Sequence, residues 1–406
     1  MKILHISTYG SGGGGIAALR LHNALLNNGI ESKYLCLENP PFGKNIYSVS
    51  PFRLSPIQYI FRKLGLYKTE VDKNIHSIKK LKGTYDFFSF PYTDYDLSKH
   101  PLVKEADIIN LHWIASFLDY RFLLKTKKKI VWTLHDMNSF QGGFHYYNEV
   151  IDNESTFREL EKKLTLIKRD LIRRCNNLEI ITLCNWMYAE SSQSETFSGK
   201  KHHLIQNSLD ISKFKIYTKS FAREVFDMPQ NKIILLFVSE SVNSKRKGMD
   251  LLLEALSALD DSANVCLAII GNSKQKINSK FETINLGNIF DERALGLVYA
   301  SADAYILSSR EDNLPNVMLE SLAGGTPVIS TPVGGMLDII QSGFNGILAK
   351  GLSASGLKEA IETFIQTKDT FDREKIRQFA IENFSPDIQA KRYIELYQNM
   401  LNLNDR

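Results

Sequence analysis

Residues 304–330 place a strand, an acidic loop, a helix and a second strand within one short segment. The run 304–307 is apolar and of the length typical of a buried parallel strand, and Pro315 has the fixed φ that suits the first position of a helix. Gly324 and Gly325 are expected to end this helix, and residues 326–330 are expected to form the next strand. The segment therefore predicts a strand–helix–strand unit of an α/β sheet.

The start of the predicted helix suits an anionic ligand. The positive end of the helix dipole lies behind a group of amides that point one way, those of Asn313, Leu314, Asn316 and Val317. Asp312 precedes the helix, and Glu320 lies roughly 7 Å further along its axis. The two carboxylates can therefore flank one extended ligand and accept hydrogen bonds from its hydroxyls. The alternative is that Asp312 only caps the helix and Glu320 is a solvated surface acid.

The segment 309–330 resembles the acidic signature of retaining GT-B glycosyltransferases of family four, the group that includes capsular and colanic-acid-type polysaccharide enzymes. Asp312 stands where the family usually has a first Glu, and Glu320 is its second acid. In the family the second acid holds the ribose of the donor and the first contacts the donor sugar. The resemblance therefore assigns Glu320 to ribose, Asp312 to the sugar, and the helix start to the donor through Asn313, Leu314, Pro315 and Asn316.

The first residues predict a strand, a glycine loop and a helix. Residues 2–7 are strand-like, 9–15 are rich in glycine, and 16–26 have a helical pattern. Glycines let the backbone approach another group closely, and the resemblance implies that Gly13 and Gly14 lie at the donor. The glycine spacing of NAD-binding folds is not present, so no NAD is expected.

Two apolar runs end in histidine. His112 and His135 follow them, at the carboxyl ends of predicted parallel strands, where open α/β sheets build their sites. The motifs Asn-Leu-His-Trp, Thr-Leu-His-Asp and Gly-Gly-Phe-His-Tyr are similar to the N-terminal domain of the colanic-acid-type subgroup, with Phe144 where Cys is common. The resemblance places His135 near the reacting sugar as a catalytic residue. For His145 a structural role is an equal alternative.

A basic turn, formed by residues 245–248, follows the predicted strand 232–239. Basic side chains at a strand-to-helix loop suit a diphosphate. By resemblance Lys247 is the catalytic, phosphate-binding lysine, and Arg246 supplies the charge of an upstream Arg that is missing; a solvated basic turn is the alternative. The resemblance also places the nucleotide base against the backbone of Leu286 and Gly287.

The expected architecture is α/β with the GT-B fold, in which two doubly wound, Rossmann-like domains face each other across a cleft. Residues 1–208 are expected to form the acceptor-side domain and 209–385 the nucleotide-sugar-binding domain, with 386–406 a helix that returns to the N-terminal domain. The boundary lies near 203–210, a segment that resembles the crossover of the family and keeps Asn207 and Asp210.

Composition limits where the protein works. The chain has a net charge of +5, no apolar run near the roughly 20 residues that span a bilayer, and an N-terminus without signal-peptide features. Its four cysteines are scattered and no metal-ligand spacing is visible, so a cytoplasmic protein without metal or cofactor is expected. Residues 56–67 mix aromatic and basic side chains, which suits peripheral contact with the inner membrane surface; a solvated face is the alternative. No nucleic-acid-binding module is present.

The expected function is transfer of a sugar, with retention, from a UDP- or GDP-linked donor to a glycan or lipid-linked glycan in bacterial surface polysaccharide synthesis. Two alternatives remain open: a catalytically silent, sugar-nucleotide-binding partner subunit, and a phosphorylase or sugar-phosphate synthase of the same fold.

Overall fold

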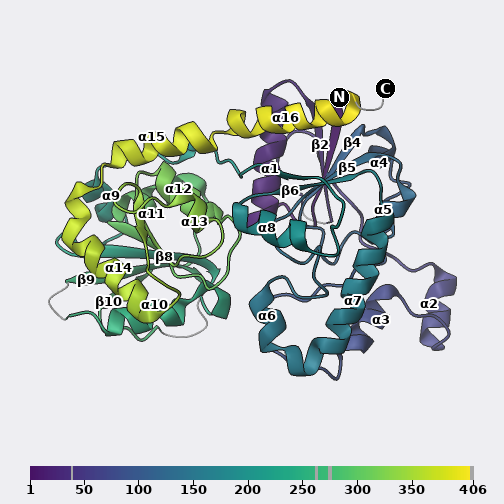
Figure 1. The fold of residues 1–406 in the computed structure, drawn as a ribbon, viewed down its shortest axis with the longest axis horizontal. Helices are drawn as coiled ribbons and strands as arrows, with labels where there is room; N and C mark the ends of the chain where they lie inside the picture. The colour runs from purple at the N-terminus through teal and green to yellow at the C-terminus, as the bar shows by residue number, and fades with distance from the viewer. Residues whose placement is uncertain (38–39, 261–263, 273–276, 403–406) are drawn as a thin grey trace. The chain divides into compact units, whose positions relative to one another are not determined.

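The computed structural model describes residues 1–37, 40–260, 264–272 and 277–402 (Figure 1). The chain divides into two compact units. The N-terminal unit comprises Met1–Ile205 together with the chain from Ala390 onward, and the C-terminal unit comprises Gln206–Gln389. The boundaries expected from the sequence were after residues 208 and 385.

The N-terminal unit is built on a seven-stranded parallel sheet with the order β3-β2-β1-β4-β5-β6-β7. The strands are β1 (Lys2–Ile6), β2 (Glu31–Cys36), β3 (Ile46–Ser48), β4 (Ile108–Leu111), β5 (Lys129–Thr133), β6 (Leu178–Thr182) and β7 (His202–Leu204). In the register, Leu111 pairs with Ile6 on one side and with Trp132 on the other. The carboxyl ends of β1, β4 and β5 therefore reach the same edge of the sheet.

Figure 1 shows the helices of this unit, of which α2 and α3 lie away from the sheet. They are α1 (Gly12–Asn27), α2 (Pro56–Lys63), α3 (Glu70–Ile78), α4 (Pro101–Glu105), α5 (Phe122–Lys125), α6 (Tyr147–Asp152), α7 (Glu154–Arg174), α8 (Asn185–Gln193) and the greater part of α16 (Pro386–Asn402). From Ala390 onward α16 packs against α1 and the sheet through Tyr393 and Tyr397, among other residues. The hydroxyls of these tyrosines lie 3.0 Å from Thr133 Oγ1 and 2.8 Å from Asn110 Nδ2.

The C-terminal unit contains a six-stranded parallel sheet with the order β10-β9-β8-β11-β12-β13. The strands are β8 (Ile233–Ser241), β9 (Val265–Asn272), β10 (Glu282–Asn285), β11 (Ala304–Leu307), β12 (Val328–Ser330) and β13 (Gly346–Leu348). The α-helices are α9 (Lys219–Val225), α10 (Met249–Ser257), α11 (Glu292–Ser301), α12 (Asn316–Ala323), α13 (Met336–Ile339), α14 (Ala354–Thr367) and α15 (Arg373–Phe384). Short 3-10 turns occupy η1 (Ile211–Lys213), η2 (Lys245–Lys247) and η4 (Lys368–Thr370).

Two parallel sheets with helices confirm the predicted α/β class, and β11 has the predicted bounds. Three local expectations need correction. Pro315 is the N-cap of α12 rather than its first helical residue, with ψ 125°. The strand after α12 begins at Val328 rather than at Thr326. Helix α1 begins within the glycine run, at Gly12, rather than after it. Among the described helices, none is long and apolar enough to cross a membrane.

Candidate functional site

Most of the predicted donor residues of the C-terminal unit lie in loops after the strands β8, β10 and β11, and Asn316 and Glu320 lie in α12, which follows the last of these loops. Because every strand pair in this sheet is parallel, these loops share the carboxyl edge of the sheet. Open α/β sheets bind their ligands at this edge. The basic turn, the acidic loop and the end of β10 therefore all lie at the carboxyl edge of this sheet.

Asp312 is the centre of a charged cluster at this edge. Its Oδ2 lies 2.5 Å from Lys247 Nζ, and its Oδ1 lies 3.5 Å from Arg246 Nη1. Ser309 Oγ donates to Oδ2 at 3.2 Å, and the Asn313 amide donates to Oδ1 at 3.1 Å. The structure thus brings together four residues named from the sequence, Arg246, Lys247, Asp312 and Asn313.

The charge of Asp312 depends on its cationic partners. The carboxyl group is buried, and burial by itself raises its pKa because the charged form loses water. Lys247 and Arg246 outweigh this effect, so the net pKa of Asp312 lies below its usual value. Asp312 therefore remains ionised, and two cations are held beside the amides that precede α12.

Two glycines allow the loops around Asp312 to approach closely. Gly248, between η2 and α10, has φ +69°, and a Cβ there would lie 2.0 Å from the carbonyl oxygen of Ser308. Gly334 has φ +50°, and a Cβ there would lie 1.8 Å from the carbonyl oxygen of Asp312. Side chains at these positions would displace the loops, so both glycines fix the position of the Lys247–Asp312 pair.

Glu320 lies within α12, where every residue from Met318 to Ala323 is buried. Tyr299 of α11 donates a hydrogen bond to Glu320 Oε2 at 3.4 Å. At the start of the same helix, Asn207 Nδ2 donates to Asn316 Oδ1 at 3.3 Å. Leu314 and Pro315 lie in the loop between Asp312 and α12. Buried Glu320 is therefore not the solvated surface acid of the alternative interpretation.

Leu286 and Gly287 follow β10 directly. The Leu286 amide donates to Ile269 O at 2.9 Å, and Gly287 O accepts from the Gly271 amide at 2.8 Å. Gly287 has φ +65°, and no other atom lies within 4 Å of the position of a Cβ. Among the described residues, neither of these two forms a hydrogen bond with Asp312, so their role at a nucleotide base stays a prediction.

The N-terminal unit holds a row of histidines at the carboxyl edge of its sheet. Nε2 of His135 lies 3.1 Å from Nδ1 of His112, whose Nε2 lies 2.9 Å from Nδ1 of His5. Burial lowers the pKa of His135 to about 4, and it lowers those of His112 and His5 well below the usual value, helped by the neighbouring rings. All three rings are therefore neutral near pH 7.

Gly14 lies against this row. A Cβ on Gly14 would lie 3.2 Å from His135 Cγ and 3.2 Å from Trp113 Cβ, whereas at Gly13 the same space is open. The glycine run therefore brings the first turn of α1 close to His135 and leaves Gly13 exposed beside it.

A second hydrogen-bonded group flanks His135. Asp136 Oδ2 accepts from Trp113 Nε1 at 2.6 Å and lies 2.6 Å from Nδ1 of His145, whose Nε2 lies 2.9 Å from Ser89 Oγ. Burial by itself raises the pKa of Asp136. His145 and the hydrogen bonds have a larger, opposite effect, so the net pKa lies below the usual value. His145 is itself buried among these partners. This arrangement favours a positioning role for His145, as its structural alternative proposed.

Comparison with known proteins identifies the C-terminal unit. Residues 232–367 match the family model described as "Glycosyl transferases group 1". The chain carries a group 1 glycosyltransferase domain. This domain contains the basic turn, the Asp312 cluster and Glu320, and both units together have the GT-B fold.

Relatives of the glycosyltransferase extend over different shares of the chain. An uncharacterized glycosyltransferase of Methanocaldococcus jannaschii is 25% identical over 321 residues, which is 75% of this chain and 77% of the relative. The lipopolysaccharide core biosynthesis glycosyltransferase LpsE of Rhizobium meliloti is 28% identical over 182 residues, 43% of this chain and 52% of LpsE. The structure of HepE of Anabaena in complex with UDP-glucose aligns with a TM-score of 0.62 at 16% identity, and covers 98% of this chain and all (100%) of HepE.

In each unit, some residues beside the predicted site residues were not singled out from the sequence. They are His5, Ser309, Tyr299 and Gly334. A glycine is the only local signal among them, because Gly334 and Gly335 follow a strand as loop glycines do. The other three are ordinary residues of a strand, a loop and a helix, and only the folding of each unit brings them beside its predicted site residues.

Proposed function

We propose that this glycosyltransferase moves a sugar, with retention of anomeric configuration, from a nucleotide sugar to a glycan or lipid-linked glycan acceptor in bacterial surface polysaccharide synthesis. The observation that supports it most is the convergence of Lys247 and Arg246 on Asp312 beside the start of α12. The cations and the helix amides suit a diphosphate, and Asp312 and Glu320 suit the hydroxyls of a sugar and a ribose.

In the proposed reaction the bond between the anomeric carbon and the diphosphate oxygen breaks. The acceptor hydroxyl attacks the same face of the sugar, and its proton passes to an oxygen of the leaving diphosphate. Lys247 and Arg246 stabilise the charge that develops on this leaving group. Removing a preorganised group of this kind typically costs about 3–4 kcal/mol of barrier, a factor of roughly 100 to 1000 in rate. His135 is proposed to contact the reacting sugar.

The donor is proposed to carry UDP or GDP, and no cofactor is proposed. Support for UDP comes from HepE, whose structure contains UDP-glucose. Support for a polysaccharide acceptor comes from LpsE, which is a glycosyltransferase of lipopolysaccharide core biosynthesis. We also propose that the protein lies in the cytoplasm and contacts the inner surface of the membrane.

The test is a donor panel with the full-length protein. UDP- and GDP-sugars are incubated with candidate acceptors, nucleoside diphosphate release is measured, and NMR gives the anomeric configuration of the product. Lys247→Ala is the control for background hydrolysis. Transfer with inversion would overturn retention. Nucleotide binding without transfer or hydrolysis on any donor would favour the silent subunit, and turnover only with phosphate or a sugar phosphate as acceptor would favour the phosphorylase or synthase.

A further inference from the structure

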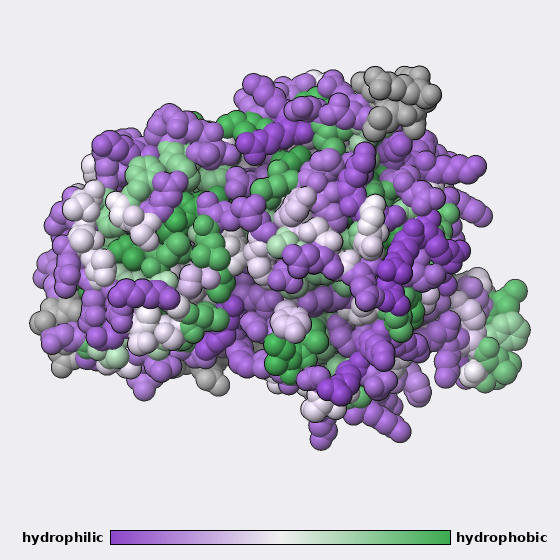
Figure 2. All heavy atoms as spheres, in the orientation of Figure 1, coloured by the Kyte–Doolittle hydropathy of each residue, from purple (hydrophilic) through white to green (hydrophobic). Residues whose placement is uncertain are grey.

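Residues 52–68, which we call the α2 segment, expose an unusual number of large apolar side chains. No residue of α2, nor of α3 beside it, is buried. Leu66 is 74% exposed and Ile57 65%. The other exposed apolar side chains of the segment are those of Phe52, Tyr59, Ile60, Phe61 and Leu64. Figure 2 shows a hydrophobic patch at this end of the N-terminal unit, at the right edge of the view, with hydrophilic surface beside it. Patches of this kind mark interaction surfaces.

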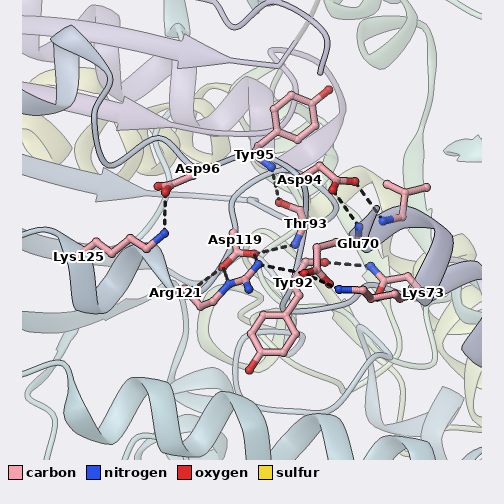
Figure 3. A network of polar contacts seen from close by, with 12 residues as sticks. Glu70, Lys73, Tyr92, Thr93, Asp94, Tyr95, Asp96, Asp119, Arg121 and Lys125 are labelled. Carbon is pink, nitrogen blue, oxygen red and sulfur yellow. Dashed lines mark hydrogen bonds and ion pairs between the residues drawn. The ribbon is translucent and has the colours of Figure 1, made fainter. Parts of the chain in front are cut away.

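Polar contacts, rather than apolar packing, hold the neighbouring helix α3 to the unit (Figure 3). The carboxylate of Asp94 accepts the backbone amides of Glu70 and Val71 at 2.9 and 3.1 Å, at the first turn of α3. Arg121 bonds to Asp119 at 2.6 Å and reaches Glu70 at 3.4 Å. Since α3 is fixed in this way, the apolar side chains of the α2 segment are not needed for its attachment.

The α2 segment is joined to α3 by one ion pair. Arg62 donates two hydrogen bonds to Asp72, at 2.9 and 2.6 Å. Both helices also begin with a capping box, at Ser55 and at Thr69. Capping and the bidentate pair preorganise the segment, so its apolar side chains are presented to solvent on a defined scaffold.

All charged side chains of the α2 segment and of the residues next to it are basic. Residues 40–69 contain no Asp or Glu, and their basic residues are Lys44, Arg53, Arg62, Lys63 and Lys68. Aromatic and aliphatic side chains next to Lys and Arg are typical of helices that lie in the interface of a membrane. A second copy of the chain fits less well, because a two-fold contact would set the same positive patches against each other.

We propose that the α2 segment docks on an anionic lipid bilayer. Its apolar side chains enter the boundary between headgroups and acyl chains, and Arg53, Lys63 and Lys68 bind the anionic headgroups. Arg62 instead joins α2 to α3 through its ion pair with Asp72. This surface is separate from the donor site, and its function does not depend on the identity of the sugar donor.

The experiment is sedimentation of the full-length protein with vesicles of phosphatidylcholine alone or mixed with phosphatidylglycerol. The wild type is expected to bind the mixed vesicles, and to do so less in high salt. Replacing Arg53, Lys63 and Lys68 together by Gln is expected to weaken binding on the order of 100-fold, since each basic residue near such a surface contributes about fivefold. Ile60→Asp is expected to weaken it at least about tenfold.

The matched control is Ile151→Asp on α6, because Ile151 is 54% exposed and Ile60 56%. This variant should bind like the wild type, and circular dichroism should show that all variants fold. Equal binding of the wild type and Ile60→Asp would overturn the proposal, and so would absence of binding to mixed vesicles. Sedimentation velocity that shows a dimer disrupted by Ile60→Asp would assign the patch to a second copy instead. None of these measurements uses sugar transfer, so their failure is distinguishable from failure of the proposed activity.

Discussion

Nδ1 of His112 lies 3.1 Å from Nε2 of His135, and this bond continues to His5 through the other nitrogen of His112. Each neutral ring carries one proton, so one of its nitrogens donates and the other accepts. The position of the proton on the ring at one end of the row therefore fixes the direction of both hydrogen bonds. Nε2 of His5 is buried, and among the described residues it has no hydrogen-bond partner. A buried N–H without a partner is rarer than a buried acceptor without one, so His5 is expected to carry its proton on Nδ1. His112 and His135 then also carry theirs on Nδ1.

His112 is therefore predicted to donate a hydrogen bond from its Nδ1 to Nε2 of His135, and so to position the His135 ring. His112→Phe should lower kcat roughly tenfold with little change in the donor KM, because a bond of about 1–2 kcal/mol that orients the reacting group is lost. His112→Asn, which can place an amide N–H near the position of Nδ1, should recover part of the rate. Steady-state kinetics on the best donor measures both variants. Equal loss in the two variants would indicate a packing role alone.

The direction of the row can be observed directly. In protein labelled with ¹⁵N at histidine, long-range proton–nitrogen NMR spectra distinguish the two neutral tautomers. The wild type is expected to show His135 protonated on Nδ1. A proton on Nε2 of His135 would contradict the assignment, whatever the activity of the variants.

The buried Lys168 of α7 makes stability depend on pH. Its Nζ donates to the backbone carbonyl of Asn138 and to Asn138 Oδ1, and burial lowers its pKa to about 7, although Glu161 and Asp136 oppose the shift. Above pH 7 the unfolded chain holds a proton that folded Lys168 has lost, so stability rises with pH. From pH 7 to 9 the gain is about 2 kcal/mol.

Urea unfolding at pH 7 and pH 9 tests this gain. Lys168→Met is expected to remove the increase, whatever its effect on stability at pH 7. Lys163→Met, on the exposed face of the same helix, is the matched control and should keep it. An equal increase in both variants would show that another group is responsible.

Local sequence signals predicted the elements of the site better than its contacts. The strand 304–307 and the glycines that end α12 follow from short patterns, and the structure has them where expected. Pro315 was placed one position too far into the helix because its fixed φ suits an N-cap as well as a first helical residue. Such one-residue differences at helix ends do not alter which loops reach the sheet edge.

The contacts that tune the site depend on long-range register. His5 and His112 are separated by 107 positions, and only the pairing of β1 with β4 brings their rings together. Lys168 lies in a helix rich in charged residues, where nothing in the sequence marks it as buried. Burial and pairing of this kind are properties of the folded chain, so a motif cannot reveal them.

The two acids of the group 1 domain are predicted to act at different steps. Asp312→Asn should lower kcat on the order of 100-fold, because Lys247 and Arg246 lose the charge that positions them beside the leaving group. Glu320→Gln should weaken nucleotide binding roughly tenfold with a smaller effect on kcat. Nucleotide titration by calorimetry and steady-state kinetics separate the effects. Asp369→Asn, at a highly exposed acid of η4, is the control that should change neither. Equal profiles for Asp312→Asn and Glu320→Gln would contradict the assignment.

Gly334 is predicted to hold the Asp312 loop through its lack of a side chain. In Gly334→Ala the new Cβ would lie 1.8 Å from the carbonyl oxygen of Asp312 at a residue with φ +50°, so the loop must move or the backbone must change. The variant should lose at least about 2 kcal/mol of stability, and it should bind the donor nucleotide more weakly because Asp312 moves with its loop. Gly351→Ala is the matched control, since no atom lies within 4 Å of a Cβ there. Thermal unfolding with and without nucleotide measures both quantities, and a Gly334→Ala protein that matches Gly351→Ala in both would show that the loop tolerates the side chain.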